Sequence, residues 1–392
     1  MSLRKIWRKD GSECMKIVLV IDQFDDANNG TTISARRFAQ ALRDHGNEVR
    51  VIATGKPADY KYAVRQMKLF PVVEHLMTSQ GMRLAVPNRH VFEKAAAWAD
   101  VVHFMMPSPL AVMGLKHVER LGIPHTAAFH CQPENLTFSL HLGNSRRVND
   151  FVYNRFRDSF FNRFTHIHCP SNMIADQLRR HGYTARLHVI SNGISPAYTY
   201  GKLPKEDWME GFFNVLMVGR YSGEKRQDEL IEACAKSRHA QEIQVILAGT
   251  GPLEKKYRRL ANELPNPIVM QFYEPERLLE ILHMADLYVH TSDAEIEAMS
   301  CMEAFACGLV PVIADSPRSA TPQFALDGRS LFPAGDTDAL AERIDWWMEH
   351  PAEREEMEHR YAEHAKAYSL EESIRQTEEM FRMAIAEQRG TA

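Results

Sequence analysis

The sequence lacks long hydrophobic runs, paired cysteines and an excess of charge of either sign. No window approaches the roughly 18 uninterrupted apolar residues that a membrane span requires, so we expect a soluble or peripheral protein. Its six cysteines are scattered without any Cys-x-x-Cys pair, which argues against a zinc site and a disulfide framework. Lys and Arg number 47 against 51 Asp and Glu, a balance that argues against a dedicated nucleic-acid-binding protein.

We also expect no signal peptide. The first 14 residues carry four basic side chains, but the apolar run at residues 17–21 is too short for the core of such a peptide. We therefore expect a cytoplasmic protein, with its basic tail either flexible or attracted to a surface. A location on the inner face of the cell membrane fits both expectations.

Short strands alternate with helices along most of the chain. Residues 16–21 and 48–53 are β-branched runs that flank a helical pattern over 32–45, which is the opening of a parallel α/β sheet. The alternation stops at a polar stretch, residues 200–211, and resumes over 213–314. Such sheets bind ligands at the carboxyl ends of their strands.

The 392 residues allow two or three domains of roughly 150 residues each. We predict an α/β protein with two facing Rossmann-like domains, residues 15–200 and 201–368, and a ligand cleft between them. A tail over residues 1–14 precedes these domains. A helix over 369–392 follows them and is expected to pack back on the first domain.

Two sets of small and basic residues follow predicted strands. Gly30 opens the first helix, where backbone N–H groups and a missing side chain would admit a phosphate. Gly219, Arg220 and Lys225 follow the strand at 213–218, where two cations could grip a diphosphate. A turn glycine and solvated basic residues are the alternative interpretation. No Gly-x-Gly-x-x-Gly or Walker sequence occurs, which argues against dinucleotide and ATP binding.

Two carboxylates, Glu295 and Glu303, are separated by seven residues. We expect the first in a loop after a strand and the second two turns into a helix. Backbone N–H groups at the start of that helix would point at an anion. This arrangement suits a nucleotide sugar, with amides on the phosphates and the carboxylates on sugar and ribose hydroxyls. The amides are those of Glu297, Ala298, Met299 and Ser300.

A series of motifs in this chain resembles the retaining GT-B glycosyltransferases of family 4. In order along the chain, the motifs are Gly30, Gly219-Arg220-x4-Lys225, the Ala-Gly-Thr-Gly-Pro segment at 248–252 and the Glu295-x7-Glu303 pair. The resemblance runs from about residue 16 to 368. Within that family, the block at 316–324 and the basic aromatic segments described below are most similar to bacterial enzymes that glucosylate diacylglycerol.

The resemblance implies transfer of a hexose from a UDP-linked donor, with retention and without a metal or other cofactor. It also implies that the domain at 15–200 binds the acceptor and that the domain at 201–368 binds the nucleotide-sugar donor. Gly30 and Thr31 would contact the phosphates, and Arg220 and Lys225 would stabilise the leaving diphosphate. Glu295 would bind the donor sugar. The nucleotide-sugar site would be completed by Gly219, by the amides of residues 297–300 and by Glu303, which would bind the ribose.

The family also has a histidine at the end of a strand of its first domain. His125 and His130 are both candidates, and alternation along the strand points them to opposite faces. His130 lies at the carboxyl end that faces the predicted cleft. The resemblance then implies that His130 contacts the donor sugar near the reacting carbon, with a structural histidine as the alternative.

The sequence departs from the family at two places, and it contains one Asp-x-Asp sequence that resembles the metal site of another glycosyltransferase class. The family often has Gly-Phe-Gly after the first glutamate, where this chain has Ile-Glu-Ala at 296–298. The usual Phe-x-Gly turn near the base reads Phe-Tyr-Glu at 272–274. The one Asp-x-Asp sequence, at 336–338, precedes a helical pattern, so we expect a helix cap there and no metal site.

Two segments combine basic and aromatic residues, 60–83 and 146–164, as amphipathic helices at lipid interfaces do. Residues 336–387 have the opposite bias, with 15 acidic residues against six Lys and Arg. We therefore predict a lipid or carbohydrate acceptor, an anionic membrane surface as partner and no nucleic acid. Three alternatives remain. For the two segments, the alternative is helices that simply pack on the sheet. For the acceptor, it is a polysaccharide or a soluble molecule, and for the activity, it is a nucleotide-sugar epimerase or a non-catalytic binding protein of the same architecture.

Overall fold

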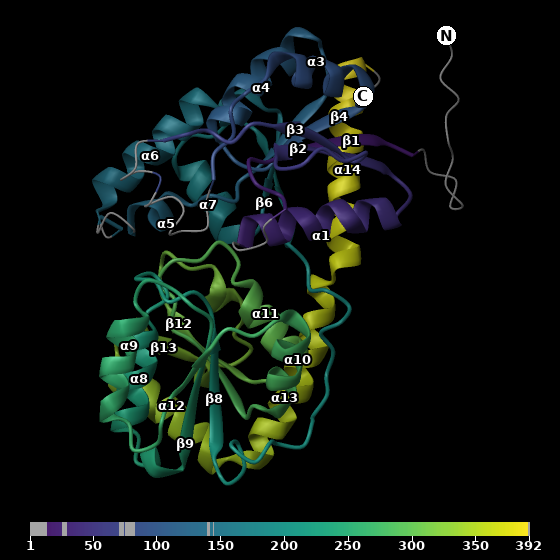
Figure 1. The fold of residues 1–392 in the computed structure, drawn as a ribbon. Coiled ribbons are helices and arrows are strands. Elements are labelled where there is room, and N and C mark those ends of the chain that lie inside the picture. Colours follow the sequence, from purple (N-terminus) through teal and green to yellow (C-terminus); the bar gives the residue numbers. More distant parts are fainter. Residues whose placement is uncertain are drawn as a thin grey trace. The chain divides into compact units, whose positions relative to one another are not determined.

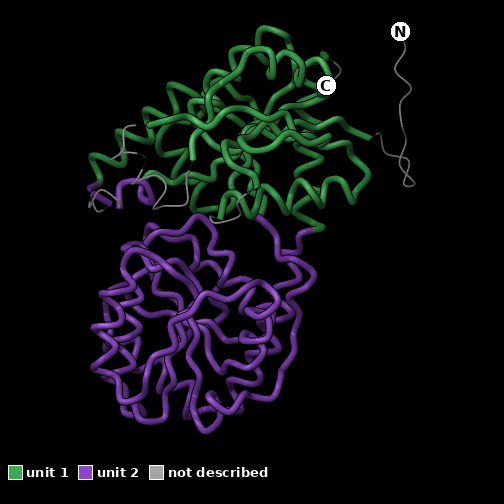
Figure 2. Tube along the Cα trace, in the orientation of Figure 1, with its two compact units in different colours: residues 1–133, 146–191, 371–392 green, residues 134–145, 192–370 purple. Residues whose placement is uncertain are grey.

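The computed structural model describes residues 14–25, 30–69, 74, 83–138, 142–143 and 145–390. The chain forms two compact units (Figures 1 and 2). Unit 1 comprises Met1–Pro133, Arg146–Ser191 and Glu371–Ala392; unit 2 comprises Glu134–Ser145 and Asn192–Leu370. The predicted N-terminal tail lies outside the described residues, apart from Cys14.

Unit 1 is built on a parallel seven-stranded sheet in the order β3-β2-β1-β4-β5-β6-β7. Its strands are β1 Lys16–Val20, β2 Glu48–Thr54, β3 Lys61–Val64, β4 Val101–Phe104, β5 His125–Ala128, β6 His166–Cys169 and β7 Arg186–Val189. Its helices are α1 Gly30–Asp44, α3 Arg89–Trp98, α4 Pro109–Arg120, α6 Arg146–Ser159, α7 Asn172–Arg180 and most of α14 Leu370–Arg389, with a 3₁₀ turn, η1, at Phe161–Arg163.

The core of unit 1 follows from its hydrophobic patterning. β1 reads Lys-Ile-Val-Leu-Val and is almost wholly buried, as a central parallel strand covered on both faces should be. α1 turns Ala35, Phe38, Ala39 and Leu42 toward the interior at helical spacing.

The C-terminal helix α14 is bonded within unit 1. Asn47 donates to Glu378 at 2.6 Å, and Nε2 of His166 lies 2.9 Å from the Glu387 carboxylate. Phe381 packs on the ring of His103, with 5.2 Å between ring centroids. These contacts lie 200 residues or more apart in the sequence, so local periodicity predicts the helix and gives no information about its partners.

Unit 2 is built on a parallel six-stranded sheet in the order β10-β9-β8-β11-β12-β13. Its strands are β8 Phe213–Val218, β9 Ile243–Ala248, β10 Val269–Gln271, β11 Leu287–His290, β12 Pro311–Asp315 and β13 Leu331–Pro333. Its helices are α5 Pro133–Phe138, whose first residue belongs to unit 1, α8 Gln227–Lys236, α9 Glu254–Leu260, α10 Pro275–Met284, α11 Met299–Ala306, α12 Thr337–Glu349 and α13 Pro351–Ala365.

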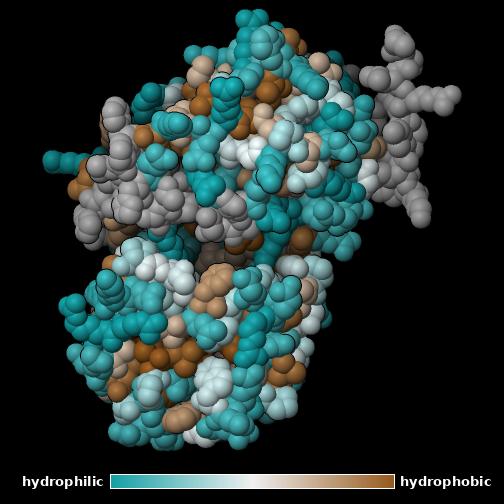
Figure 3. Space-filling model, viewed as in Figure 1, coloured by the Kyte–Doolittle hydropathy of each residue, from teal (hydrophilic) through white to brown (hydrophobic). Residues whose placement is uncertain are grey.

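Both sheets reverse their strand order beside the first strand, between β1 and β4 and between β8 and β11. Such a switch point leaves a crevice at the carboxyl ends of the strands, where α/β proteins bind ligands. The prediction of two Rossmann-like α/β domains is confirmed. Hydrophilic side chains dominate the face that Figure 3 presents, with apolar ones gathered in smaller patches.

The prediction of a helix over residues 60–83 is wrong for the first residues of that range. Residues 61–64 form β3 because they pair with β2, and Lys61, whose side chain is only 2% exposed, binds the Asp25 carboxylate at 2.6–2.7 Å. Lys61 is therefore not available to a lipid surface. The expected contributors Phe70 and Met77 lie outside the described residues. The second basic aromatic segment does form a helix, α6, which ends at Ser159.

Candidate active site

The predicted site residues of unit 2 gather where β8 and β11 end. Lys225 donates from Nζ to Oε1 of Glu295, and Nε2 of His290 lies 3.2 Å from the same oxygen. His290 is the last residue of β11, while Lys225 and Glu295 lie in the loops that follow β8 and β11. The topology therefore brings together residues that are 70 positions apart in the sequence.

The charges of this group are fixed by its surroundings. Burial acts to raise the pKa of Glu295, but the Lys225 ammonium and His290 outweigh it and bring that pKa to about 2. Burial acts to lower the pKa of Lys225, yet Glu295 and Glu224 raise it above its ordinary value. Burial also lowers the pKa of His290. At neutral pH the group is a carboxylate, an ammonium and a neutral imidazole.

Arg220 lies two residues beyond β8, after Gly219, and is partly buried. Burial lowers the pKa of its guanidinium, against the opposing effect of Glu224, but an arginine remains charged at any physiological pH. The side chain of Gln227 donates to the Arg220 carbonyl at 2.8 Å, which ties this loop to the start of α8. Arg220 and Lys225 thus place two cations in one short loop.

The loop after β9 passes close to the loop after β8. A Cβ on Gly249 would lie 2.1 Å from the Gly219 carbonyl oxygen, and one on Gly251 would lie 2.5–2.6 Å from the Tyr221 backbone. Only glycine permits this approach. The Ala-Gly-Thr-Gly-Pro segment is therefore explained by packing, which shapes the loop that carries Arg220.

Helix α11 begins at Met299, directly after Ala298, which has left-handed backbone angles of φ 59° and ψ 64°. The amides of Met299 and Ser300 lie at the N-terminus of this helix, where an anion is favoured. Ser300 donates from its hydroxyl to the Val218 carbonyl at 3.2 Å, which anchors the helix to the end of β8. Glu303 is largely buried and lies on the second turn of the helix.

The carboxylate of Glu297 has a structural partner. It accepts hydrogen bonds from the backbone N–H and the side-chain amide of Asn192, both at 2.7 Å, and it is 1% exposed. These bonds fix the segment between Glu295 and α11. The contribution expected of Glu297 to a donor site would therefore come from its backbone N–H.

In unit 1, Gly30 and the half-buried Thr31 begin α1. A Cβ built on Gly30 would meet no atom within 4 Å among the described residues. Packing of the described chain therefore does not require glycine at this position, and a ligand that approaches the helix N-terminus would make use of its absent side chain.

His130 lies two residues beyond β5 and is 7% exposed. Its ring meets that of His168 edge to face, with 5.2 Å between centroids, and His168 stacks at 6.5 Å on His103. Burial, together with His168 and His103, brings the pKa of His130 well below its ordinary value. His130 is therefore a neutral imidazole at pH 7.

His125 lies elsewhere. Its Nδ1 is 2.8 Å from the Ile123 carbonyl, and its ring packs edge to face on Phe164 with 5.4 Å between centroids. These contacts indicate that His125 helps to hold the fold of unit 1 together.

Sequence reasoning missed His290, Asn192, His103 and His168. His290 carried a usable signal, because a polar residue at the carboxyl end of a buried parallel strand lies at the ligand-binding edge. Asn192 and the two unit 1 histidines had no comparable signal, since their partners lie in distant elements.

The described residues contain no group of three or more His, Cys, Asp and Glu side chains that could hold a metal ion. Asp336 caps α12, accepting the Ala339 N–H at 2.9 Å, and Asp338 pairs with Lys236 at 2.9 Å. The helix cap predicted for the Asp-x-Asp sequence is confirmed. No helix in the described part of the chain is both long and apolar enough to cross a bilayer.

Known proteins are similar to this chain in sequence or in fold. A GDP-mannose-dependent α-mannosyltransferase of Mycobacterium tuberculosis is 24% identical over 323 residues, which cover 76% of this chain and 79% of that protein. Sucrose-phosphate synthase of Thermosynechococcus elongatus is 16% identical, with a TM-score of 0.76 over 95% of this chain and 100% of that one. Anabaena Alr3699/HepE, crystallised with UDP and glucose, is 18% identical, with a TM-score of 0.71 over 94% of this chain and 100% of that one.

Two family models match the chain, one for each half. Residues 28–198 match Glycosyltransferase Family 4, and residues 202–368 match Glycosyl transferases group 1. The fold and both matches agree with the family that the sequence motifs resemble. The chain belongs to the family 4 glycosyltransferases of GT-B fold.

Proposed function

We propose that this glycosyltransferase moves a hexose from a UDP-linked donor to a hydroxyl of a membrane lipid acceptor, a glycolipid or a diacylglycerol, with retention of the anomeric configuration. The observation that carries the proposal is the buried pair of Lys225 and Glu295, with Arg220 in the same loop as the lysine. A cation held beside a carboxylate suits a ligand that combines a diphosphate with hydroxyl groups. The UDP and glucose bound by the Anabaena protein support the choice of donor.

The proposed reaction breaks the bond between the anomeric carbon and the diphosphate oxygen. Arg220 and Lys225 stabilise the charge that develops on the leaving diphosphate, together with the N-terminus of α11. The acceptor oxygen bonds to the same face of the anomeric carbon, and its proton passes to the departing phosphate. Neither glutamate acts as a nucleophile in this scheme.

Each remaining residue is assigned a binding role. Glu295 accepts hydrogen bonds from hydroxyls of the donor sugar, and Glu303 binds the ribose. Gly30 and Thr31 receive the phosphates from unit 1. His130, neutral because it is buried, can donate one hydrogen bond and accept another at the donor sugar.

The choice of a lipid acceptor rests on the surface of α6. This helix exposes Arg146, Arg147, Phe151 and Arg155 together with one acidic residue, Asp158, and Phe151 is 69% exposed. Only Asn149 and Tyr153 of the helix are buried. An exposed aromatic ring among arginines suits the interface of an anionic membrane, where each cation adds about 1 kcal/mol of attraction.

The test is a donor screen with nucleotide release as the readout, run in excess EDTA with UDP-glucose, UDP-galactose and GDP-mannose. We expect release with a UDP-hexose, undiminished by EDTA, and a glycosylated lipid in the product by mass spectrometry. Loss of activity that Mg²⁺ or Mn²⁺ restores would contradict metal independence. A donor sugar epimerised without any acceptor would identify an epimerase instead.

A further inference from the structure

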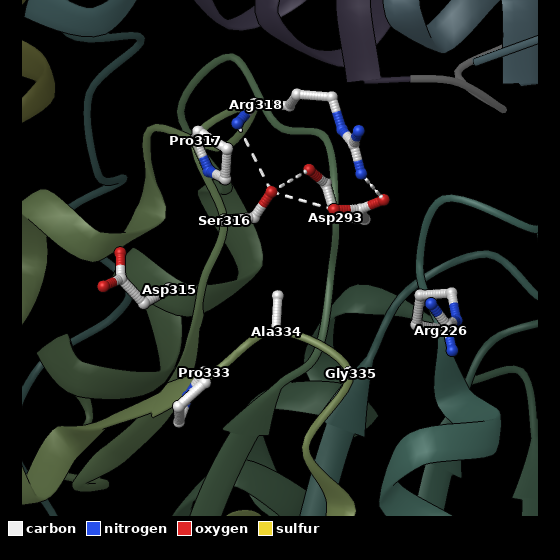
Figure 4. A pocket seen from close by; sticks show the side chains of 9 residues that line it. All are labelled: Arg226, Asp293, Asp315, Ser316, Pro317, Arg318, Pro333, Ala334 and Gly335. Atoms are coloured by element: carbon white, nitrogen blue, oxygen red, sulfur yellow. Dashed lines mark hydrogen bonds and ion pairs between the residues drawn. The ribbon is translucent and has the colours of Figure 1, made fainter. Parts of the chain in front are cut away.

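Unit 2 contains a polar pocket that the proposed mechanism does not use. The pocket has a volume of about 450 Å³ and lies at the carboxyl ends of β12 and β13 (Figure 4). Its size falls within the roughly 300–1,000 Å³ of small-molecule sites. Two arginines and two aspartates contribute to its lining, namely Arg226, Arg318, Asp293 and Asp315.

One wall of the pocket is a hydrogen-bonded network. Ser316 donates from its hydroxyl to the carboxylate of Asp293 at 2.8 Å and lies 2.7 Å from the Asp293 carbonyl, while the Arg318 guanidinium binds the other carboxylate oxygen (Figure 4). Asp293 and Ser316 are largely buried. The donors and acceptors of this wall are therefore held in place before any ligand arrives.

The other wall is held by Glu229, which is 2% exposed. Its carboxylate binds the Arg226 guanidinium at 2.8 Å and accepts the N–H of Gly335 at 3.3 Å. Arg226 and the loop at residues 333–335 are therefore fixed to one another. Arg226 has a left-handed backbone with φ 53°, a conformation that costs a non-glycine residue energy and that these contacts hold in place.

The pocket borders the candidate donor site. Lys225 reaches Glu295, whereas the next residue, Arg226, lines the pocket. Asp293 of the pocket lies two residues before Glu295, and the Glu295 N–H donates to the Arg318 carbonyl at 3.3 Å. A group bound in the pocket would thus lie beside a sugar held by Glu295.

The chemistry of the lining selects the kind of occupant. Arg318 is paired with Asp293, and Arg226 is paired with Glu229 and Asp228, so neither guanidinium carries an uncompensated charge that would select an anion. The wall instead offers guanidinium donors and carboxylate acceptors to hydroxyl groups. A hydroxyl can accept from a guanidinium and donate to a carboxylate at once. The rings of Pro317 and Pro333 add apolar surface against which the C–H face of a sugar can lie.

We propose that this pocket binds an uncharged, polyhydroxylated group of the acceptor, that is, the sugar of a lipid-linked saccharide. The inference rests on the proposed function and narrows its acceptor from any lipid hydroxyl to a sugar-headed lipid.

The test is Ala334→Trp, which adds a ring at an exposed residue of the pocket wall. The control, Asp338→Trp, adds the same ring at a position outside the pocket whose side chain is 79% exposed. Transfer is measured from UDP-glucose to monohexosyl-diacylglycerol and, separately, to diacylglycerol, both in mixed anionic vesicles. Donor KM is measured from nucleotide release in the same assays.

We expect Ala334→Trp to raise the KM for the hexosyl lipid at least tenfold more than it changes the donor KM, with no such rise for the control. An unchanged hexosyl-lipid KM, or a change confined to the donor, would overturn the proposal, as would wild-type transfer to diacylglycerol alone.

A binding measurement separates this inference from the proposed function. If the wild type turns over no donor, the proposed function fails. Sugar binding in the pocket is then tested separately, by saturation-transfer NMR with methyl α-D-glucopyranoside as the ligand. A signal that Ala334→Trp abolishes and Asp338→Trp retains supports a sugar site. Equal signals in both variants, or none in the wild type, refute it.

Discussion

Lys225 and Glu295 form a largely buried ion pair across the switch point of the unit 2 sheet, with His290 3.2 Å from the shared carboxylate oxygen. A carboxylate and an ammonium taken out of water are each costly unless paired, so each residue makes the other tolerable in this position. The pair keeps both groups charged at neutral pH, which is the state that the proposed mechanism requires.

Lys225→Met should lower kcat by about 10²–10³-fold, because it removes a fixed cation from the leaving diphosphate. It also removes the ammonium that lowers the pKa of Glu295, so that pKa should rise. Steady-state nucleotide release measures the first effect. The matched control is Lys255→Met at an exposed position of α9, which should retain wild-type rates; a similar loss in both variants would contradict the role of Lys225.

The buried histidines of unit 1 should make its stability sensitive to acid. Burial lowers the pKa of His103 to about 3 and of His168 to about 4, against about 6.5 when unfolded. At these two positions the unfolded chain binds more protons, so their contribution to the free energy of unfolding is greatest above pH 6.5 and falls as the pH drops toward 4. Each such histidine contributes a slope of at most about 1.4 kcal/mol per pH unit.

Urea unfolding between pH 7 and pH 4.5 checks this slope. His168→Asn should flatten it, whereas His90→Asn, at a side chain that is 92% exposed, should leave it unchanged. Equal slopes in the wild type and His168→Asn would show that the cluster does not govern acid stability.

Ala298→Gly should stabilise unit 2 by about 0.5–1 kcal/mol. Ala298 has a left-handed φ of 59°, which costs a non-glycine residue roughly 1–2 kcal/mol, and part of the gain is lost to the greater freedom of glycine in the unfolded chain. Thermal or urea unfolding measures the difference. Ala339→Gly within α12 should instead destabilise by about 0.5–1 kcal/mol, and a loss of stability in both variants would refute the assignment of strain to Ala298.

The exposed face of α6 predicts binding to anionic vesicles that weakens with salt. Arg147→Glu combined with Phe151→Ser should reduce vesicle affinity about tenfold or more, since one cation and one aromatic ring leave the interface. Co-sedimentation at moderate salt is the assay. Arg258→Glu, on the exposed side of α9, is the charge-matched control; absence of wild-type binding would favour a soluble or polymer-borne acceptor.

Local patterns predicted most of the fold. The β-branched runs of β1 and β8 and the helical spacing of α1 are properties of neighbouring residues, and both sheets follow from their alternation. Lys61 shows where this fails. A basic residue reads as solvent-exposed, but its pairing with Asp25, 36 residues away, buries it in a strand.

In the candidate site, too, local patterns could be predicted from the sequence and contacts between distant residues could not. Strand ends identify where Arg220, Lys225 and Glu295 lie, because the topology of a parallel sheet brings such ends together. The bond between Asn192 and Glu297, 105 residues apart, and the ring contact of His130 with His168 have no local signature. These contacts exist only once the sheets have formed, so the sequence alone does not reveal which residues surround and position the site residues.

The most direct test of the account is nucleotide release from a UDP-hexose by the wild type, by Arg220→Ala and by Glu303→Ala, with donor affinity measured alongside. The account predicts that Arg220→Ala lowers turnover by two or more orders of magnitude, because the leaving diphosphate loses a fixed cation. It predicts that Glu303→Ala mainly weakens nucleotide binding. Near-normal turnover and affinity in both variants would contradict the assignment of this site.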